Sequence, residues 1–144
     1  MINGAVIGSP ISHSLSPVLH KAAFDFLGID GNYKAIEVKL GSLSEFFTER
    51  SREFDYFSIT MPLKEEALEI GITPNELTTR IQSANTLYKV DGSWKITSTD
   101  GSGMVSALSH AGIHHLTSVL ILGAGGTARA VAGSLDSISV FSQI

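Results

Sequence analysis

Short apolar runs alternate with segments of helical periodicity along this chain, and this alternation limits the possible fold more than any other feature. Strands are expected at 5–7, 33–38 and 56–60, and helices are expected at 17–27, 43–50 and 64–70. Parallel strands need a crossover connection, which is usually a helix. The sequence therefore predicts an α/β fold whose substrate domain is a three-layer, mostly parallel sheet.

The second half of the chain adds a hairpin and then a different kind of unit. Strands at 86–90 and 94–97 flank Asp91-Gly92-Ser93, which is a strong signal for an antiparallel hairpin. A helix is expected at 102–111, followed by an apolar strand at 118–122, a glycine-rich turn, a helix at 126–135 and a last strand at 138–141. This succession predicts an incomplete Rossmann-type βαβ unit after the sheet.

Composition and charge exclude several classes of function. The net charge is −4 and no basic run is present, which argues against a nucleic-acid partner. Without cysteine there is no disulfide framework and no thiolate metal site, and His110, His114 and His115 have no metal-ligand companions. No apolar run approaches the roughly 18 residues of a membrane span, and the first residues lack the positive charge of a secretion signal. We therefore expect a cytoplasmic protein with no membrane partner and no metal.

The stretch from Ser58 to Lys64 places a hydroxyl and an ammonium where a strand turns into a helix. An apolar strand ends at Thr60, Pro62 suits the first turn of a helix, and Lys64 opens the helical segment. Ligands of open α/β sheets bind at the carboxyl ends of strands, so this junction is a candidate site. The alternative, on spacing alone, is that Lys64 is an ordinary solvated lysine.

The glycine-rich turn is a second candidate site, and its residues are candidates for binding a dinucleotide. These residues are Gly123, Ala124, Gly125, Gly126, Thr127 and Ala128, of which the first, third and last fit the G-x-G-x-x-G/A pattern. Glycines let the backbone approach a pyrophosphate, and a helix N-terminus favours its charge. The alternative is a turn that only packs a helix on a strand. An acidic residue about 20 positions further on is missing, which weakens an NAD interpretation and leaves NADP open.

Five short motifs, in order and spread over nearly the whole chain, resemble those of the shikimate dehydrogenase family. They are Gly8-Ser9-Pro10 with Ser12 to Pro17 and His20, then Thr60 to Lys64, Ser83 to Leu87, Thr99 to Gly103, and Gly123 to Ala130. The resemblance implies a substrate-binding and catalytic domain at 1–101, then a linker helix and the first, incomplete part of a dinucleotide-binding domain at 102–144. It also implies the family's reaction, which is the reversible reduction of 3-dehydroshikimate to shikimate with NADP as cofactor.

The same resemblance assigns roles to particular residues. Lys64 and Asp100 become the catalytic pair, and binding of shikimate is assigned to Ser14, Ser16, Thr60, Asn85 and Asp100. Hydride transfer to a ketone builds charge on its oxygen, which an adjacent ammonium can stabilise and protonate. The alternatives are turn and cap chemistry for Ser14 and Ser16, a backbone bridge for Asn85 and helix capping for Asp100.

The chain also departs from the family's usual pattern. Serines at 58 and 98 stand where asparagine is usual, and Ser142-Gln143 replaces the Asn-Arg that grips the 2′-phosphate of NADP, so NAD is an alternative cofactor. Family members need roughly 100 further residues to complete two domains, so the chain is expected to be a fragment that is inactive alone. A quinate/shikimate paralogue and a stand-alone shikimate-binding module without catalysis are alternatives, and a homodimer is left open.

Overall fold

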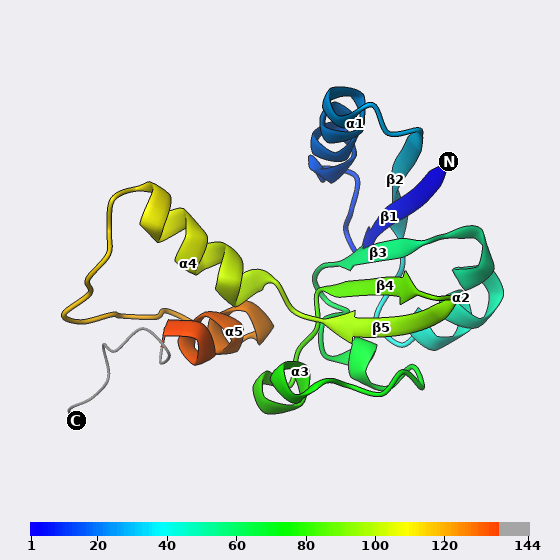
Figure 1. The fold of residues 1–144 in the computed structure, drawn as a ribbon. Coiled ribbons are helices and arrows are strands. Elements are labelled where there is room, and N and C mark those ends of the chain that lie inside the picture. The colour runs from blue at the N-terminus through cyan, green and yellow to red at the C-terminus, as the bar shows by residue number, and fades with distance from the viewer. Residues whose placement is uncertain (136–144) are drawn as a thin grey trace.

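The computed structural model describes residues 1–135, whose path is drawn in Figure 1. Five strands form one sheet in the order β2-β1-β3-β4-β5. The elements in chain order are β1 (Ile2–Gly8), α1 (Ser16–Leu27), β2 (Gly31–Glu37), α2 (Leu43–Arg50), the 3-10 helix η1 (Ser51–Glu53), β3 (Tyr56–Ile59), the 3-10 helix η2 (Glu66–Leu68), α3 (Glu76–Ile81), β4 (Thr86–Val90), β5 (Ser93–Thr97), α4 (Asp100–His110) and α5 (Gly126–Leu135). The predicted α/β class is confirmed.

The sheet is parallel on one side and antiparallel on the other. β1 lies between β2 and β3 and is parallel to both, because α1 and then α2 return the chain to the same end of the sheet. β4 and β5 add an antiparallel hairpin beside β3. The hairpin turns at Asp91 and Gly92, whose φ values of 49° and 77° are those of the tight two-residue turn that an Asp-Gly pair favours.

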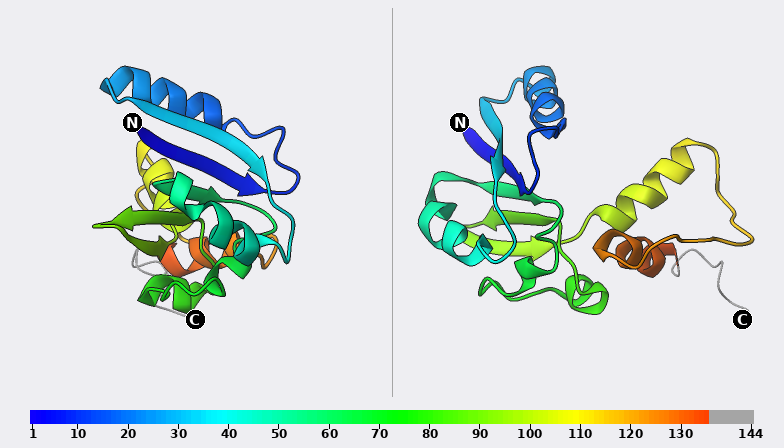
Figure 2. Two further views of the ribbon diagram at one scale, coloured as in Figure 1. Left: turned by 90° about the vertical axis from the view of Figure 1, so that its right-hand side faces the viewer. Right: turned by 180° about the vertical axis from the view of Figure 1, so that it is seen from behind.

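Helices cover both faces of the sheet, so the substrate part of the chain has three layers (Figure 2). Alternate residues of β1 point to opposite faces, Ala5 and Ile7 to one and Val6 to the other. On the first face α2 contributes Leu43 to the packing, and on the second face α1 contributes Phe24. Each face of the central strand is thereby removed from water.

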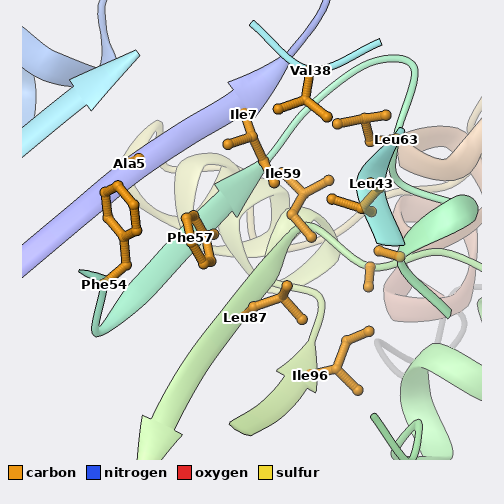
Figure 3. Close-up of a cluster of buried hydrophobic side chains, with 12 residues drawn as sticks. Ala5, Ile7, Val38, Leu43, Phe54, Phe57, Ile59, Leu63, Leu87 and Ile96 are labelled. Carbon is orange, nitrogen blue, oxygen red and sulfur yellow. The ribbon is translucent and has the colours of Figure 1, made fainter. Parts of the chain in front are cut away.

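The larger core lies on the α2 face and surrounds Phe57 of β3, which is fully buried (Figure 3). The ring centroids of Phe54 and Trp94 lie 4.8 and 5.4 Å from that of Phe57. Full burial of a side chain of this kind contributes roughly 1.5–3 kcal/mol. This packing holds the end of β3, from which the loop to η2 departs. The buried members of the core are Ala5, Ile7, Val38, Leu43, Phe54, Phe57, Ile59, Leu63, Ala67, Ala84, Leu87 and Ile96.

A smaller cluster of aromatic side chains joins α1 to the opposite face. The imidazole of His20 stacks on Tyr33 at 3.7 Å between centroids and shares a 2.7 Å hydrogen bond with the hydroxyl of Tyr56. Tyr33 in turn donates its hydroxyl proton to Oγ of Ser58 at 2.7 Å. Burial lowers the pKa of His20, and burial together with the neighbouring Tyr33 raises the pKa of Tyr56 to about 12. His20 therefore anchors α1, and with it the loop that precedes α1.

Two expected elements differ in the structure. The segment 118–122 was expected to be a strand but has an irregular path, because no strand lies beside it in the described residues to complete a ladder. The helix expected at 64–70 is reduced to η2, since the chain first makes a series of turns that carry Leu63 into the core. The strand expected at 138–141 lies outside the described residues. Among the residues that the structure describes, the Rossmann-type unit is represented by its glycine-rich turn and α5.

None of the helices within residues 1–135 is long and apolar enough to cross a membrane. The same residues contain no group of three or more His, Cys, Asp or Glu side chains that could hold a metal ion.

Candidate active site

One edge of the sheet gathers the candidate residues from separate segments of the chain. The parallel strands β1 and β3 both end at this edge, and β4, which runs the opposite way, begins there. β5 returns to the same edge, because Thr86 at the start of β4 pairs with Thr97 at the end of β5. In Figure 1 this is the left-hand edge of the sheet, on the side where α4 and α5 lie. The loops after β1, β3 and β5 and the residue before β4 therefore meet.

An ammonium and a carboxylate make direct contact at this edge. Lys64, in the turn between β3 and η2, places its Nζ 2.5 Å from Oδ2 of Asp100, the first residue of α4. Their side chains are 19% and 15% exposed, so the pair is largely shielded from water but still reachable. Lys64 is therefore not the ordinary solvated lysine that its spacing alone allowed.

Asp100 directs its charge into the site and does not cap α4. The N-cap position is Thr99, and the Asp100 carboxylate accepts hydrogen bonds from Lys64, Asn85 and Thr127. Burial acts to raise the pKa of Asp100, but the hydrogen bond and charge of Lys64, with hydrogen bonds from Thr127 and Asn85, hold that pKa below its ordinary value. The N-terminal end of a helix also favours a carboxylate. Asp100 is consequently ionised at neutral pH and gives Lys64 an anionic partner.

Asn85 is held by hydrogen bonds on both sides of its amide. Its Nδ2 donates to Oδ1 of Asp100 at 2.6 Å and to Oγ1 of Thr99 at 3.0 Å. Its Oδ1 accepts from the backbone N–H of Thr99 at 2.9 Å and from the hydroxyl of Thr86 at 2.7 Å. Its backbone carbonyl also accepts from the N–H of Ile59 at 2.7 Å, so Asn85 bridges strands as well. These partners define which way the amide faces.

Ser14 lies on the loop after β1, Ser16 is the first residue of α1, and Thr60 directly follows β3. The loop after β1 is tied to the turn after β3, because the N–H of Ser9 donates to the carbonyl oxygen of Met61 at 3.0 Å. Oγ of Ser14 accepts from the N–H of Ser16 at 3.3 Å, which is the turn chemistry considered for this loop. Binding of a ligand by these hydroxyls stays a prediction.

The glycine-rich turn closes the site from the side opposite the sheet. A cleft of about 400 Å³ lies between the turn after β3 and this turn. Thr127 contacts the charged pair directly, accepting from Nζ of Lys64 at 2.8 Å and donating to Oδ2 of Asp100 at 2.9 Å. The residues lining the cleft are Thr60, Met61, Pro62, Lys64, Glu65, Leu122, Gly123, Gly125, Gly126, Thr127 and Ala128.

Two glycines of the turn have different surroundings. A side chain at Gly125 would meet no protein atom within 4 Å, so packing does not explain glycine there, whereas close approach of a ligand would. At Gly126 a Cβ would lie 2.2 Å from Oγ of the buried Ser83, so this glycine lets α5 pack against the sheet unit. The first N–H groups of α5 have no helical acceptors and favour an anion. The turn therefore fits a phosphate-bearing cofactor, while Ser142-Gln143 lies outside the described residues.

Arg129, which no motif singled out for its side chain, holds the turn in place. Its guanidinium donates to the carbonyl oxygens of Ile81 at 2.8 Å, of Gln82 at 2.9 Å and of Ala124 at 2.9 Å. It also donates to the carboxylate of Glu65 at 2.5 Å. Three of these partners are backbone groups far away in sequence or within the turn, so no pattern of residue types could have identified them.

An ammonium–carboxylate pair at the carboxyl edge of an α/β sheet, facing a glycine-rich turn, is the arrangement expected of a two-unit enzyme of the dehydrogenase type. Comparison with known proteins specifies the family. The family model described as the shikimate dehydrogenase substrate binding domain matches residues 6–87. The chain therefore belongs to the shikimate dehydrogenase family.

Individual relatives agree with this assignment. Shikimate dehydrogenase (NADP(+)) from Thermus thermophilus is 39% identical over 135 residues, which cover 94% of this chain and 51% of the relative. Its counterpart from Methanothrix thermoacetophila is 41% identical over 134 residues, which cover 92% and 49%. The crystal structure of a Thermus thermophilus shikimate 5-dehydrogenase in complex with NADP(H) and shikimate matches with a TM-score of 0.91 and 38% identity, covering 97% of this chain and 54% of that one. The chain spans about half the length of the curated relatives it matches.

Proposed function

We propose that this chain supplies the substrate-binding domain, at 1–101, and the start of the cofactor domain, at 102–144, of an NADP-dependent shikimate dehydrogenase. That enzyme reversibly reduces 3-dehydroshikimate to shikimate. The observation that carries the proposal is the contact between Lys64 and Asp100 at the carboxyl edge of the sheet, opposite the glycine-rich turn. The activity named for the relatives and the ligands bound to the Thermus thermophilus enzyme support the same substrate and cofactor.

Lys64 acts as the general acid in ketone reduction. An ammonium has three N–H donors, of which Lys64 gives one to Asp100 and one to Thr127, so the third is available to the ketone oxygen. Bound NADPH supplies the hydride. Lys64 stabilises the negative charge that develops on the oxygen and gives it a proton. Asp100 keeps the ammonium in place and stays anionic itself.

The hydroxyls of shikimate and its carboxylate bind to Ser14, Ser16, Thr60 and Asn85, with Asp100 contributing to both binding and catalysis. Hydroxyl and amide groups suit a ligand that is hydroxylated and anionic. Both N–H groups of Asn85 already donate, to Asp100 and to the Thr99 hydroxyl, so a ligand oxygen replaces the Thr99 hydroxyl as acceptor. The bonds that Oδ1 accepts from Thr86 and from the N–H of Thr99 keep the amide oriented, so little freedom is lost when a ligand binds.

The pyrophosphate of NADP is held by the backbone of residues 123–128 at the N-terminal end of α5. The open space at Gly125 supports this placement. Because Ser142-Gln143 lacks the arginine that would pair with a 2′-phosphate, turnover is measured with both NADP and NAD. We also propose a cytoplasmic location, in keeping with a soluble metabolite as substrate, and a homodimer as one candidate assembly to be tested by sedimentation.

Steady-state turnover by the protein encoded by the complete gene tests the proposal, because the relatives are about twice as long as this chain. The wild type should oxidise shikimate with NADP. Lys64→Ala should lower kcat by roughly 10²–10⁴-fold, since proton transfer is made in the transition state, while KM for shikimate changes little. Lys21→Ala removes an exposed lysine on α1 and should leave kcat unchanged.

Each alternative outcome has a distinct signature. Near-normal turnover by Lys64→Ala would remove Lys64 from the chemistry. Preferred turnover of quinate would indicate the quinate/shikimate paralogue. Shikimate binding without turnover in the complete protein would indicate a binding module and would overturn the proposed activity.

A further inference from the structure

The hydroxyl of Thr127 lies between the two members of the acid–base pair. Its oxygen accepts from Nζ of Lys64 at 2.8 Å and its proton goes to Oδ2 of Asp100 at 2.9 Å. Lys64 and Asp100 also contact each other at 2.5 Å, so the three side chains form a closed ring of hydrogen bonds. The ring joins the turn after β3, the first residue of α4 and the first turn of α5.

The side chain of Thr127 has a different role from the backbone of the glycine-rich turn, because its only donor is already used. A threonine hydroxyl has one proton, and Thr127 gives it to Asp100. No hydroxyl proton is left for a nucleotide phosphate, which is the role that the glycine pattern assigned to the turn as a whole. The side chain of Thr127 instead occupies one donor of Lys64 and one acceptor site of Asp100.

Packing of α5 against the sheet unit keeps Thr127 at this place. Gly126, the preceding residue, lies so close to Ser83 that a Cβ would come within 2.2 Å of Oγ. Arg129, two residues further on, donates to the carbonyl oxygens of Ile81 and Gln82 at 2.8 and 2.9 Å. The hydroxyl of Thr127 therefore reaches the pair only while α5 is docked on the edge of the sheet.

We propose that Thr127 is a positioning residue of the acid–base pair. Its hydroxyl holds the Lys64 ammonium and the Asp100 carboxylate in their relative positions, and those positions therefore depend on docking of the glycine-rich turn. What the pair then does for catalysis rests on the function proposed above, whereas the ring of hydrogen bonds does not. Valine has the shape of threonine without its hydroxyl, and serine keeps the hydroxyl. Thr127→Val and Thr127→Ser therefore separate the hydroxyl from the volume of the side chain.

The first test follows the titration of the Asp100 carboxyl by ¹³C NMR in the 144-residue chain. Burial raises the pKa of Asp100 and the bond from Thr127 is one of the contacts that lower it, so Thr127→Val should raise that pKa and Thr127→Ser should keep it near the wild-type value. Thr48→Val is the matched control, because the Thr48 hydroxyl bonds a carbonyl of its own helix, and the Asp100 titration should not change. An unchanged titration in Thr127→Val overturns the inference, whatever the activity.

The second test compares the kinetics of the same variants in the complete protein. Loss of one positioning hydrogen bond should lower kcat by about tenfold in Thr127→Val, with KM for NADP within about twofold of the wild type and kcat restored in Thr127→Ser. A raised KM for NADP with kcat retained would mean that the hydroxyl serves the cofactor and would overturn the inference. If the wild type does not turn over shikimate, the proposed function fails, and the Asp100 titration still decides the role of Thr127.

Discussion

Removal of the Lys64 charge, with its apolar stem kept, should destabilise the folded chain by a measurable amount. In Lys64→Met, Asp100 loses its charged partner at 2.5 Å and keeps neutral donors on Asn85 and Thr127. A hydrogen bond to a charged group contributes about 1.5–3 kcal/mol. The two side chains are 19% and 15% exposed, so screening by solvent reduces this contribution only in part. The free energy of unfolding at neutral pH should therefore fall by about 1.5–3 kcal/mol.

This loss should depend on pH in a defined direction. Burial raises the pKa of Asp100, but in the wild type Lys64, Thr127 and Asn85 bring it below its ordinary value of 3.8. A carboxyl with a lowered folded-state pKa stabilises the fold above its unfolded pKa, and that contribution is lost as pH falls through the folded value. In Lys64→Met no cation opposes the effect of burial, so the contribution shrinks or reverses. The difference in free energy of unfolding between the wild type and Lys64→Met should be largest at pH 7, and it should shrink as pH falls below about 4.

Urea unfolding followed by circular dichroism at neutral and acidic pH measures both quantities. Lys21→Met is the matched control, because Lys21 and Asp25 form an ion pair on α1 whose side chains are 75% and 67% exposed. Such exposed pairs contribute about 0–1 kcal/mol. The reasoning is refuted if Lys64→Met unfolds like the wild type at pH 7, or if its deficit is the same at both pH values.

Ligand binding can be tested by calorimetry, and docking of α5 can be tested by hydrogen exchange. Ser14→Ala and Asn85→Ala in the complete protein should each weaken shikimate binding by about 1–3 kcal/mol in calorimetric titrations, because polar groups of the ligand lose their partners. Unchanged affinity in both variants would place the ligand elsewhere. Gly126→Ala should lower the hydrogen-exchange protection of α5, at a cost of about 1–3 kcal/mol, because its Cβ would lie 2.2 Å from Oγ of Ser83. Ser83→Gly should restore the protection, and protection retained in Gly126→Ala alone would contradict the close packing.

The sheet and the meeting of the two segments that carry the charged pair follow from rules that act along the chain. Alternating apolar strands and amphipathic helices predict parallel strands, and Asp91-Gly92 predicts the hairpin that follows. Once the strand directions are known, the turn after β3 and the start of α4 must lie at one edge of the sheet. Strand directions bring these two segments to one edge, whereas the pairing of Lys64 with Asp100, 36 residues apart, was predicted from the resemblance to shikimate dehydrogenases.

The expected strand at 118–122 is a case in which residue composition alone does not predict the structure. Its residues have the composition of a buried strand, but a strand also needs a neighbour with which to exchange backbone hydrogen bonds. In the structure Leu120 and Leu122 are 84% and 89% exposed, so neither a ladder nor a core covers them within the described residues. Composition predicts that a segment is able to pair, whereas the presence of a partner depends on other segments.

Within the glycine-rich turn, the packing alternative holds for Gly126, whereas binding of a dinucleotide by the turn stays a prediction. Gly125 faces open space, Gly126 is required by Ser83, and the side chain of Thr127 belongs to the ring with Lys64 and Asp100. A pattern of glycines reports on the backbone of the turn and carries no information about what its side chains touch. Since one turn of helix supplies both the anion-favouring N–H groups and the hydroxyl of the ring, a displacement of α5 alters both together. On the proposed function, changes that displace α5 should therefore affect cofactor affinity and proton transfer jointly, whereas loss of the Thr127 hydroxyl alone should affect proton transfer. Changes at Ser14, on the loop before α1, or at Ser16, the first residue of α1, should affect substrate binding.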